Sequence, residues 1–207
     1  MPDGAIGSVE DLRSIYGEPN QLAAKKAIPR LDQHCKAFIA ASPFLVIGSA
    51  AAGGGPGDVS PRGDPPGFVA VLDDETLLLP DRLGNNRVDT LENVAGGNSN
   101  VALIFFVPGM NETLRVNGKA AVTTDQAMLA PLAIDGKPPK SGLIIKVDQA
   151  YLHCAKALIR SKLWDPSVQI ERSSFPSLGR MIADQVKGVD GEQAEKRIEE
   201  SYRTRLY

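Results

Sequence analysis

Three arginines lie in two short runs of the sequence whose residue types suit the binding of an anion. Arg62 lies in Ser-Pro-Arg-Gly-Asp-Pro-Pro-Gly (residues 60–67). Arg82 and Arg87 lie in Pro-Asp-Arg-Leu-Gly-Asn-Asn-Arg (residues 80–87). Arginine can grip a phosphate through two parallel hydrogen bonds. Because an apolar hairpin pattern connects the two runs, which we interpret as cationic turns, we expect the three arginines to converge on one anion.

A helix that begins near residue 88 is expected to add to this site. Asn85 or Asn86 is expected to cap it, and Asp89 and Glu92 suit its first turns. The free N–H groups at such a helix start favour an anion, so the pattern predicts a pocket for a phosphorylated ligand. The alternative interpretation is that the arginines are solvated charges and the Pro/Gly/Asp runs are ordinary turns.

The elements that must position these residues are mainly strands. Apolar and alternating patterns predict six of them, at residues 44–50, 68–72, 76–79, 101–107, 113–122 and 142–150. Short turns join most of them, which is typical of an antiparallel barrel. The Gly-rich residues 51–58 are predicted to be a hairpin loop, since they lack the Lys-Ser/Thr of a P-loop. Gly118, inside a predicted strand, indicates a bulge or a close approach of two backbones.

Together with Leu91 and Asn93, the two arginine-containing runs resemble the FMN-binding split-barrel flavoproteins related to pyridoxamine 5'-phosphate oxidase. The resemblance covers about residues 30–165 and includes His-Cys-x-Lys-x-x-x-Arg-Ser-x-Leu-Trp at residues 153–164. It implies a mainly β fold with flanking helices, a six-stranded antiparallel split β-barrel. The expected organisation is an N-terminal helical segment (1–42), a split-barrel domain (43–165) and a C-terminal helical arm (166–207).

The resemblance also implies an FMN site in a groove between the two subunits of a homodimer. The implied contacts from one subunit are Ser60, Arg62, Gly63, Asp64, Pro80, Asp81, Arg82, Asn85, Asn86 and Arg87. Arg62 is expected to face the phosphate or ribityl chain, residues 80–82 the ring, and residues 85–87 the phosphate. Lys156, Arg160 and Trp164 are implied as contacts from the partner chain. From the residues alone, Trp164 is equally well a packing anchor among solvated basic residues.

Other chemistry is less well supported by the spacing of the candidate residues. His34-Cys35 and His153-Cys154 are adjacent pairs, whereas zinc ligands are usually separated by two or more residues, so no metal site is expected. Neighbours on a strand point to opposite faces, so His153 and Cys154 are not expected to act as base and nucleophile.

Composition gives no reason to expect nucleic acid or a membrane surface as a partner. The net charge of −2 gives no reason to expect nucleic acid, and the chain lacks an apolar run long enough to span a membrane. Residues 1–7 lack the basic and apolar parts of a signal peptide, so we expect a cytoplasmic protein.

The expected function is that of an FMN-dependent oxidoreductase with an unassigned small-molecule substrate. The C-terminal substrate signature of pyridoxamine 5'-phosphate oxidase itself is absent, so vitamin B6 oxidation is not implied. Flavin chemistry needs no catalytic motif from the protein, because the ring carries the hydride or electrons. Two alternatives therefore stay open: a non-catalytic flavin-binding or storage protein, and a deazaflavin-dependent reductase on the same fold.

Overall fold

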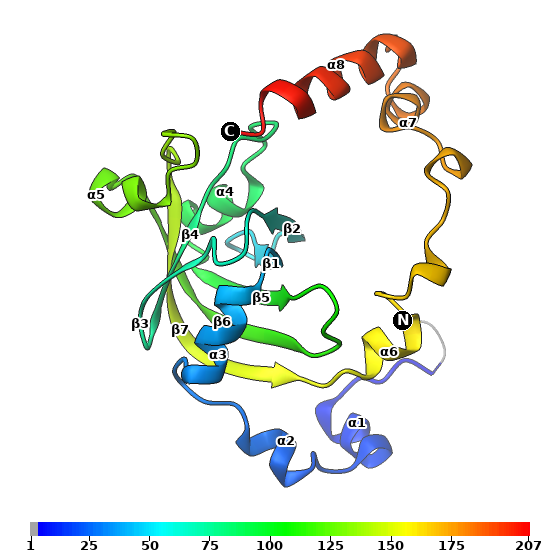
Figure 1. Cartoon of the computed structure of the whole chain (residues 1–207). Coiled ribbons are helices and arrows are strands. Elements are labelled where there is room, and N and C mark those ends of the chain that lie inside the picture. The colour runs from blue at the N-terminus through cyan, green and yellow to red at the C-terminus, as the bar shows by residue number, and fades with distance from the viewer. Residues whose placement is uncertain (1–3) are drawn as a thin grey trace.

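The computed structural model describes residues 4–207, so the first three residues of the segment considered as a signal peptide lie outside the described part. Seven strands form one antiparallel sheet in the order β2-β1-β5-β6-β7-β4-β3 (Figure 1). They are β1 (Phe44–Ala50), β2 (Gly57–Gly63), β3 (Ala70–Asp73), β4 (Thr76–Pro80), β5 (Asn100–Phe106), β6 (Thr113–Thr123) and β7 (Gly142–His153). Within residues 4–207 no pairing joins the edge strands β2 and β3, so the barrel stays open. The predicted mainly β fold with flanking helices is confirmed, with seven strands where six were expected.

The additional strand is β2, whose residues the sequence pattern presents as loop. It pairs with β1 in an unbroken register from Phe44 opposite Gly63 to Ala50 opposite Gly57. The prediction that residues 60–63 form a turn is therefore wrong. Pro61 is tolerated here because β2 is an edge strand, where a residue without an N–H need not complete a ladder.

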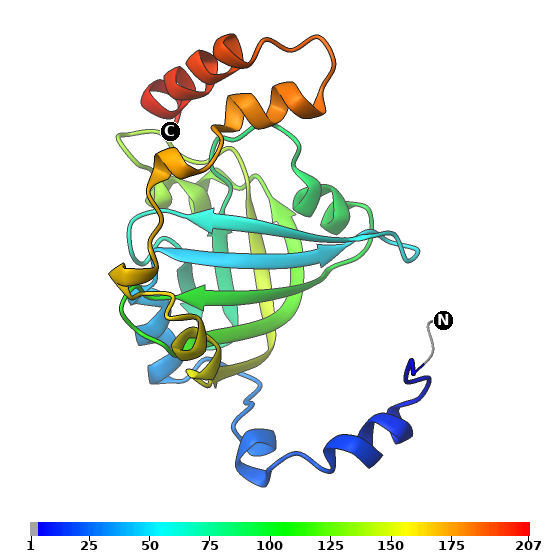
Figure 2. The ribbon, with the colours of Figure 1, turned by 90° about the vertical axis from the view of Figure 1, so that its right-hand side faces the viewer.

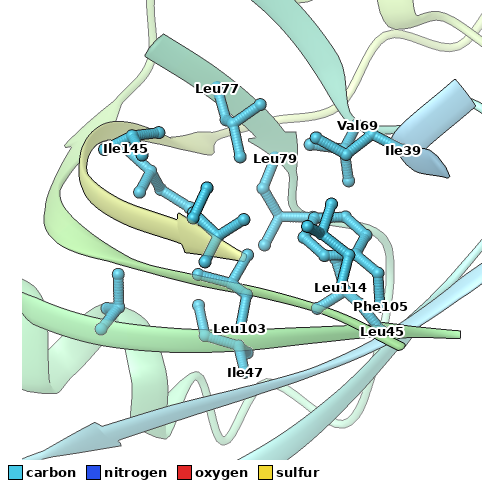
Figure 3. Close-up of a cluster of buried hydrophobic side chains, with 14 of the residues drawn as sticks. Ile39, Leu45, Ile47, Val69, Leu77, Leu79, Leu103, Phe105, Leu114 and Ile145 are labelled. Carbon is cyan, nitrogen blue, oxygen red and sulfur yellow. The ribbon is translucent and has the colours of Figure 1, made fainter. Parts of the chain in front are cut away.

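The hydrophobic core fills the inside of the curled sheet. The inward side chains of β1 and β5 include Leu45, Ile47 and Phe105, which are fully buried (Figure 3). Helix α3 (Gln33–Ala41) adds to this core through Cys35, Phe38 and Ile39. The helix begins there because Asp32 caps it, with Oδ1 accepting a hydrogen bond of 2.8 Å from the Cys35 N–H.

The long strands β6 and β7 bend the sheet around this core. Their register shifts between Asn117 and Gly118, which is the irregularity predicted at that glycine. The carbonyl of Lys146 occupies the space where a side chain at residue 118 would lie, so the close approach is also confirmed. Between the two strands lie α5 (Gln126–Leu129) and the short helix η1 (Ala130–Leu132).

Helical segments extend from the barrel at both ends of the chain. The N-terminal segment carries α1 (Val9–Tyr16) and α2 (Gln21–Lys25), and neither helix has a buried residue. The C-terminal segment carries α6 (Lys156–Ser161), η2 (Pro166–Val168), η3 (Arg172–Ser174), α7 (Leu178–Gln185) and α8 (Gly191–Thr204). In Figure 2, α7 and α8 lie together over one end of the barrel, while α1 and α2 extend from the opposite end. None of the helices in the described part of the chain has the length and apolar character that a membrane crossing requires.

Candidate functional site

A pocket of about 1010 Å³ opens at the end of the barrel where β2 and β4 finish. Three segments of the barrel meet there: β2, the chain that follows β4, and the loop that precedes β7. The last two leave the sheet side by side, because Pro80 pairs with Gly142 and the Asp81 N–H donates to the Ser141 carbonyl over 2.9 Å. The pocket is lined by nine of the predicted site residues: Ser60, Arg62, Gly63, Pro80, Asp81, Arg82, Asn85, Asn86 and Arg87.

Asp64, the tenth predicted residue of this group, ties two of these segments together. Its Oδ2 accepts a 2.6 Å hydrogen bond from Nε of Arg82, and its side chain is fully buried. Arg82 is also largely buried and donates from its Nη2 to the Leu132 carbonyl over 2.8 Å. The ion pair therefore links the end of β2 to the segment after β4, and it uses donors of Arg82 that a ligand would otherwise need.

Arg62 is held by its own strand. Its Nη1 donates to the Ser60 hydroxyl and to the Pro61 carbonyl. Arg62 also faces Asp81, whose partial burial raises the pKa of that carboxyl while the guanidinium of Arg62 lowers it, with burial the larger effect. Arg62 therefore lines the pocket beside a carboxyl that is costly to ionise.

Arg87 is the most exposed of the three arginines. Its Nε forms an ion pair of 3.0 Å with Asp89, and the two side chains are 74% and 42% exposed. Such an exposed pair contributes little to stability and can exchange its partner readily. Arg87 is thus free to turn towards a ligand anion, although Asp89 competes for it.

Helix α4 (Asp89–Ala95) begins beside Arg87, but its start differs from the prediction. Val88 occupies the cap position in a left-handed conformation (φ 47°) and makes no side-chain cap bond. Asn85 instead accepts a hydrogen bond from the Arg87 N–H over 3.1 Å, so neither predicted asparagine caps the helix. Asp89 and Glu92 do lie in the first turn, as expected.

Several pocket residues were not predicted from the sequence. Lys137 and Lys140 flank Pro138-Pro139 in the loop before β7, and Tyr202 and Tyr207 come from the C-terminal segment. The two lysines around a Pro-Pro turn were a visible local signal. The tyrosines were not, because the sequence does not show that the last helix returns to the barrel.

The C-terminal tyrosine is bonded directly to the buried ion pair. Tyr207 Oη donates to Oδ1 of Asp64 over 2.6 Å, and the Arg82 guanidinium carbon lies 5.8 Å from the centre of the Tyr207 ring. Lys137 Nζ donates to the carbonyl oxygen of Tyr207 over 3.1 Å. The hydrogen bond to Asp64 raises the pKa of Tyr207, with burial adding to the effect.

The remaining predicted residues, Lys156, Arg160 and Trp164, do not line this pocket. They lie in and after α6, and Trp164 Nε1 donates to the Met110 carbonyl over 2.7 Å, which fixes this segment to the β5–β6 turn. The family resemblance implies that these three residues contact the pocket of a second subunit, and this stays a prediction.

The pocket combines positive charge with an apolar wall. Five cationic residues line it against three aspartates, and Phe68, Leu91, Tyr202 and four prolines give it apolar surface. Such a site suits a ligand with an anionic end and a flat apolar body. Among residues 4–207, no cluster of three or more His, Cys, Asp or Glu side chains is placed to hold a metal ion. Cys35 lies in the core, where burial raises the pKa of its thiol to about 11.

Solved structures share a similar chain path with this protein at low sequence identity. HupZ from Group A Streptococcus is 18% identical, with a TM-score of 0.48 over 58% of this chain and 92% of that one. A provisionally assigned pyridoxamine 5'-phosphate oxidase from Lactobacillus delbrueckii is 19% identical, with a TM-score of 0.46 over 60% and 95%. An FAD-binding protein from Mycobacterium smegmatis is 15% identical, with a TM-score of 0.41 over 61% and 97%. No curated protein sequence matches the chain.

A match to a protein-family sequence model shows which family this chain belongs to. Residues 31–154, more than half of the chain, match the model described as pyridoxamine 5'-phosphate oxidase. That range begins just before α3, runs through all seven strands and contains ten of the thirteen predicted site residues. The chain therefore belongs to the pyridoxamine 5'-phosphate oxidase family.

Proposed function

We propose that this protein is an FMN-dependent oxidoreductase that acts on a small molecule and works as a homodimer with the flavin at the subunit interface. One observation carries the proposal: two separate sequence runs, predicted to bind a phosphorylated flavin, line a single large pocket. A volume of about 1010 Å³ is at the upper end of typical small-molecule sites, which span about 300–1,000 Å³. This leaves room for a flavin mononucleotide and part of a substrate.

The residues present fit FMN. Arg87 is exposed and weakly paired, so it would hold the phosphate by exchanging Asp89 for it. Arg62, fixed by Ser60, would contact the ribityl chain or the phosphate. The ring would lie against the apolar wall.

When bound, the flavin ring would supply the hydride or electron transfer. The chain's own residues would bind and orient the flavin and keep water from it. Asp81, at the side of the pocket expected to face the ring, has a raised pKa, so its carboxyl can hold a proton closer to neutral pH than an exposed aspartate can.

The outer face of the sheet supports the homodimer. Along β1 and β5 the inward residues are buried, yet the outward Val46 and Ile104, which pair across the two strands, are also apolar. They line a hollow of about 270 Å³ together with Arg115 and His153. Strands that are apolar on both faces usually have both faces covered.

His153, which lines the same hollow, is compatible with a covering partner. Its Nδ1 is buried and has no hydrogen-bond partner among residues 4–207. Burial and the positive charges of Arg115 and Lys26 lower the pKa of this imidazole, so it is neutral at pH 7 and able to accept or donate one bond. A neutral imidazole at this face can be covered without the cost of burying a charge.

Titration of the purified full-length protein with FMN tests the proposal. Quenching of flavin fluorescence gives the Kd, and Arg87→Ala should raise it about tenfold or more, because a charge-assisted phosphate contact disappears. Arg13→Ala is the matched control, because it removes an exposed arginine on α1, a helix that does not line the pocket and extends from the opposite end of the barrel (Figure 2). An unchanged Kd for Arg87→Ala would show that Arg87 does not contact FMN. If the wild type takes up no FMN, the proposal that FMN is the cofactor is wrong.

Turnover separates the enzyme from the two alternatives. An oxidoreductase should consume reduced nicotinamide in the presence of an electron acceptor, whereas a storage protein should bind FMN without turnover. The absorption spectrum of the bound cofactor distinguishes a flavin from a deazaflavin.

A further inference from the structure

The C-terminal arm forms one wall of the pocket. Leu178, Tyr202 and Tyr207 all line the cavity, although they lie at the start of α7, near the end of α8 and beyond it. Figure 1 shows how this arises: the chain leaves the barrel after α6, passes along the outside, and returns with α8 to the pocket end of the barrel. The barrel alone leaves this side of the pocket open.

The two helices of the arm pack chiefly on each other. The Gly179 N–H donates to Oε2 of Glu195 over 2.6 Å, and a side chain at residue 179 would overlap the backbone of α8. The chain that connects the arm to the barrel is poorly buried, with Ile170 70% and Phe175 55% exposed. The arm is therefore a small rigid unit on a loosely held connection.

Two hydrogen bonds tie this unit to the pocket, and both are made by Tyr207. Its hydroxyl donates to Asp64, and its carbonyl oxygen accepts from Lys137. Asp64 is also the partner of Arg82, so a single buried carboxylate joins β2, the segment after β4 and the arm. Loss of the Tyr207 bond would leave one oxygen of that carboxylate without its donor, which favours the closed position.

We propose that residues 178–207 form a lid over one side of the ligand pocket, latched by the hydrogen bond between Tyr207 and Asp64, and that opening of this lid speeds the entry and exit of a ligand. The proposal rests on the proposed function in naming FMN as the ligand. Tyr207 is a positioning residue here: it acts on the ligand through the closure of the pocket. The raised pKa of its phenol agrees with a hydroxyl that is held by a carboxylate in the closed state.

The kinetics of FMN binding distinguish a latch from an ordinary contact. Tyr207→Phe keeps the ring and removes the donor, so an unlatched lid should raise both the association and the dissociation rate constants, each about tenfold, with a smaller change in their ratio. A residue that merely supports the bound flavin would change dissociation alone. Stopped-flow fluorescence measures both rates, and an unchanged association rate overturns the lid. Tyr16→Phe, on the exposed α1, is the matched control.

Hydrogen exchange tests the lid without any ligand. In the FMN-free full-length protein, Tyr207→Phe should increase amide exchange in residues 205–207 and in the loop 137–141, where the arm meets the barrel, while the barrel strands exchange as in the wild type. Equal exchange at this contact in the two proteins overturns the latch. If the wild type takes up no FMN, the proposed function is wrong. The exchange measurement then tests by itself whether Tyr207 latches the arm against the pocket.

Discussion

The three arginines of the pocket have the same side chain and three different environments. Arg82 is buried and pairs with Asp64, Arg62 is held by its own strand, and Arg87 is exposed. A residue type in a motif therefore does not by itself fix a role. Burial and competing partners decide which guanidinium is available, and here they favour Arg87 and Arg62 as ligand contacts and Arg82 as a link in the fold.

Asp81 gives a prediction at this scale, because its pKa in the folded protein is raised mainly by burial. A raised pKa means that ionisation of Asp81 opposes folding. This free-energy cost of ionising Asp81 is absent at pH values below its pKa in the unfolded chain, near 3.8. It is fully present at pH values above its pKa in the folded protein. Asp81→Asn should therefore stabilise the protein at pH 7, with a gain that shrinks as the pH falls towards 4.

The urea concentration at the midpoint of unfolding, measured for the wild type and Asp81→Asn from pH 7 down to pH 4, reports this difference in stability. An Asp81→Asn variant that is less stable than the wild type at pH 7 would show that the attraction of Arg62 outweighs the cost of burial.

At the scale of elements, an edge strand and a bulge shape the site. β2 brings Ser60 and Arg62 to the pocket because it pairs with β1 in full register, in spite of its proline and glycines. The irregularity at Gly118 lets β6 approach β7 more closely than any side chain would allow. Both features depend on neighbours that are distant in the sequence, although only the second carried a local signal.

Gly118→Ala should destabilise the protein by about 1–3 kcal/mol, because the added methyl group would overlap the Lys146 carbonyl and force the strands apart. Urea denaturation measures the difference in unfolding free energy. Gly57→Ala, also in a strand, is the matched control, since its added methyl group meets no atom closer than 4.0 Å. A Gly118→Ala variant as stable as this control would show that the strand pair relaxes without cost.

At the scale of the whole molecule, the chain leaves apolar surface uncovered in several places. The outer sheet face presents Val46 and Ile104, and α1 exposes Val9, Ile15 and Tyr16. A monomer seldom leaves so many apolar side chains exposed on segments that extend from its body. The proposed homodimer would cover the sheet face and bring Trp164 and its basic neighbours towards the pocket of the other subunit.

Ile104→Glu tests this arrangement, because a carboxylate on the covered face should break the dimer and leave the core intact. Sedimentation velocity should show a dimer for the wild type and a monomer for the variant, and the monomer should lose its FMN on dilution. Leu72→Glu, on the edge strand β3 and 44% exposed in the wild type, is the control and should remain a dimer. A monomeric Ile104→Glu protein that retains FMN would refute a site shared between subunits.

The sequence by itself determined the family, the mainly β fold and nine of the residues that line the pocket, because periodic apolar strands and two dense motifs are local signals. It did not determine that residues 60–63 are a strand, since their pairing with β1 overrides the preferences of proline and glycine. Nor did it show that Tyr207 reaches Asp64, 143 positions away. Only the tertiary structure decided these points, because a hydrogen bond between distant segments leaves no spacing pattern in the chain.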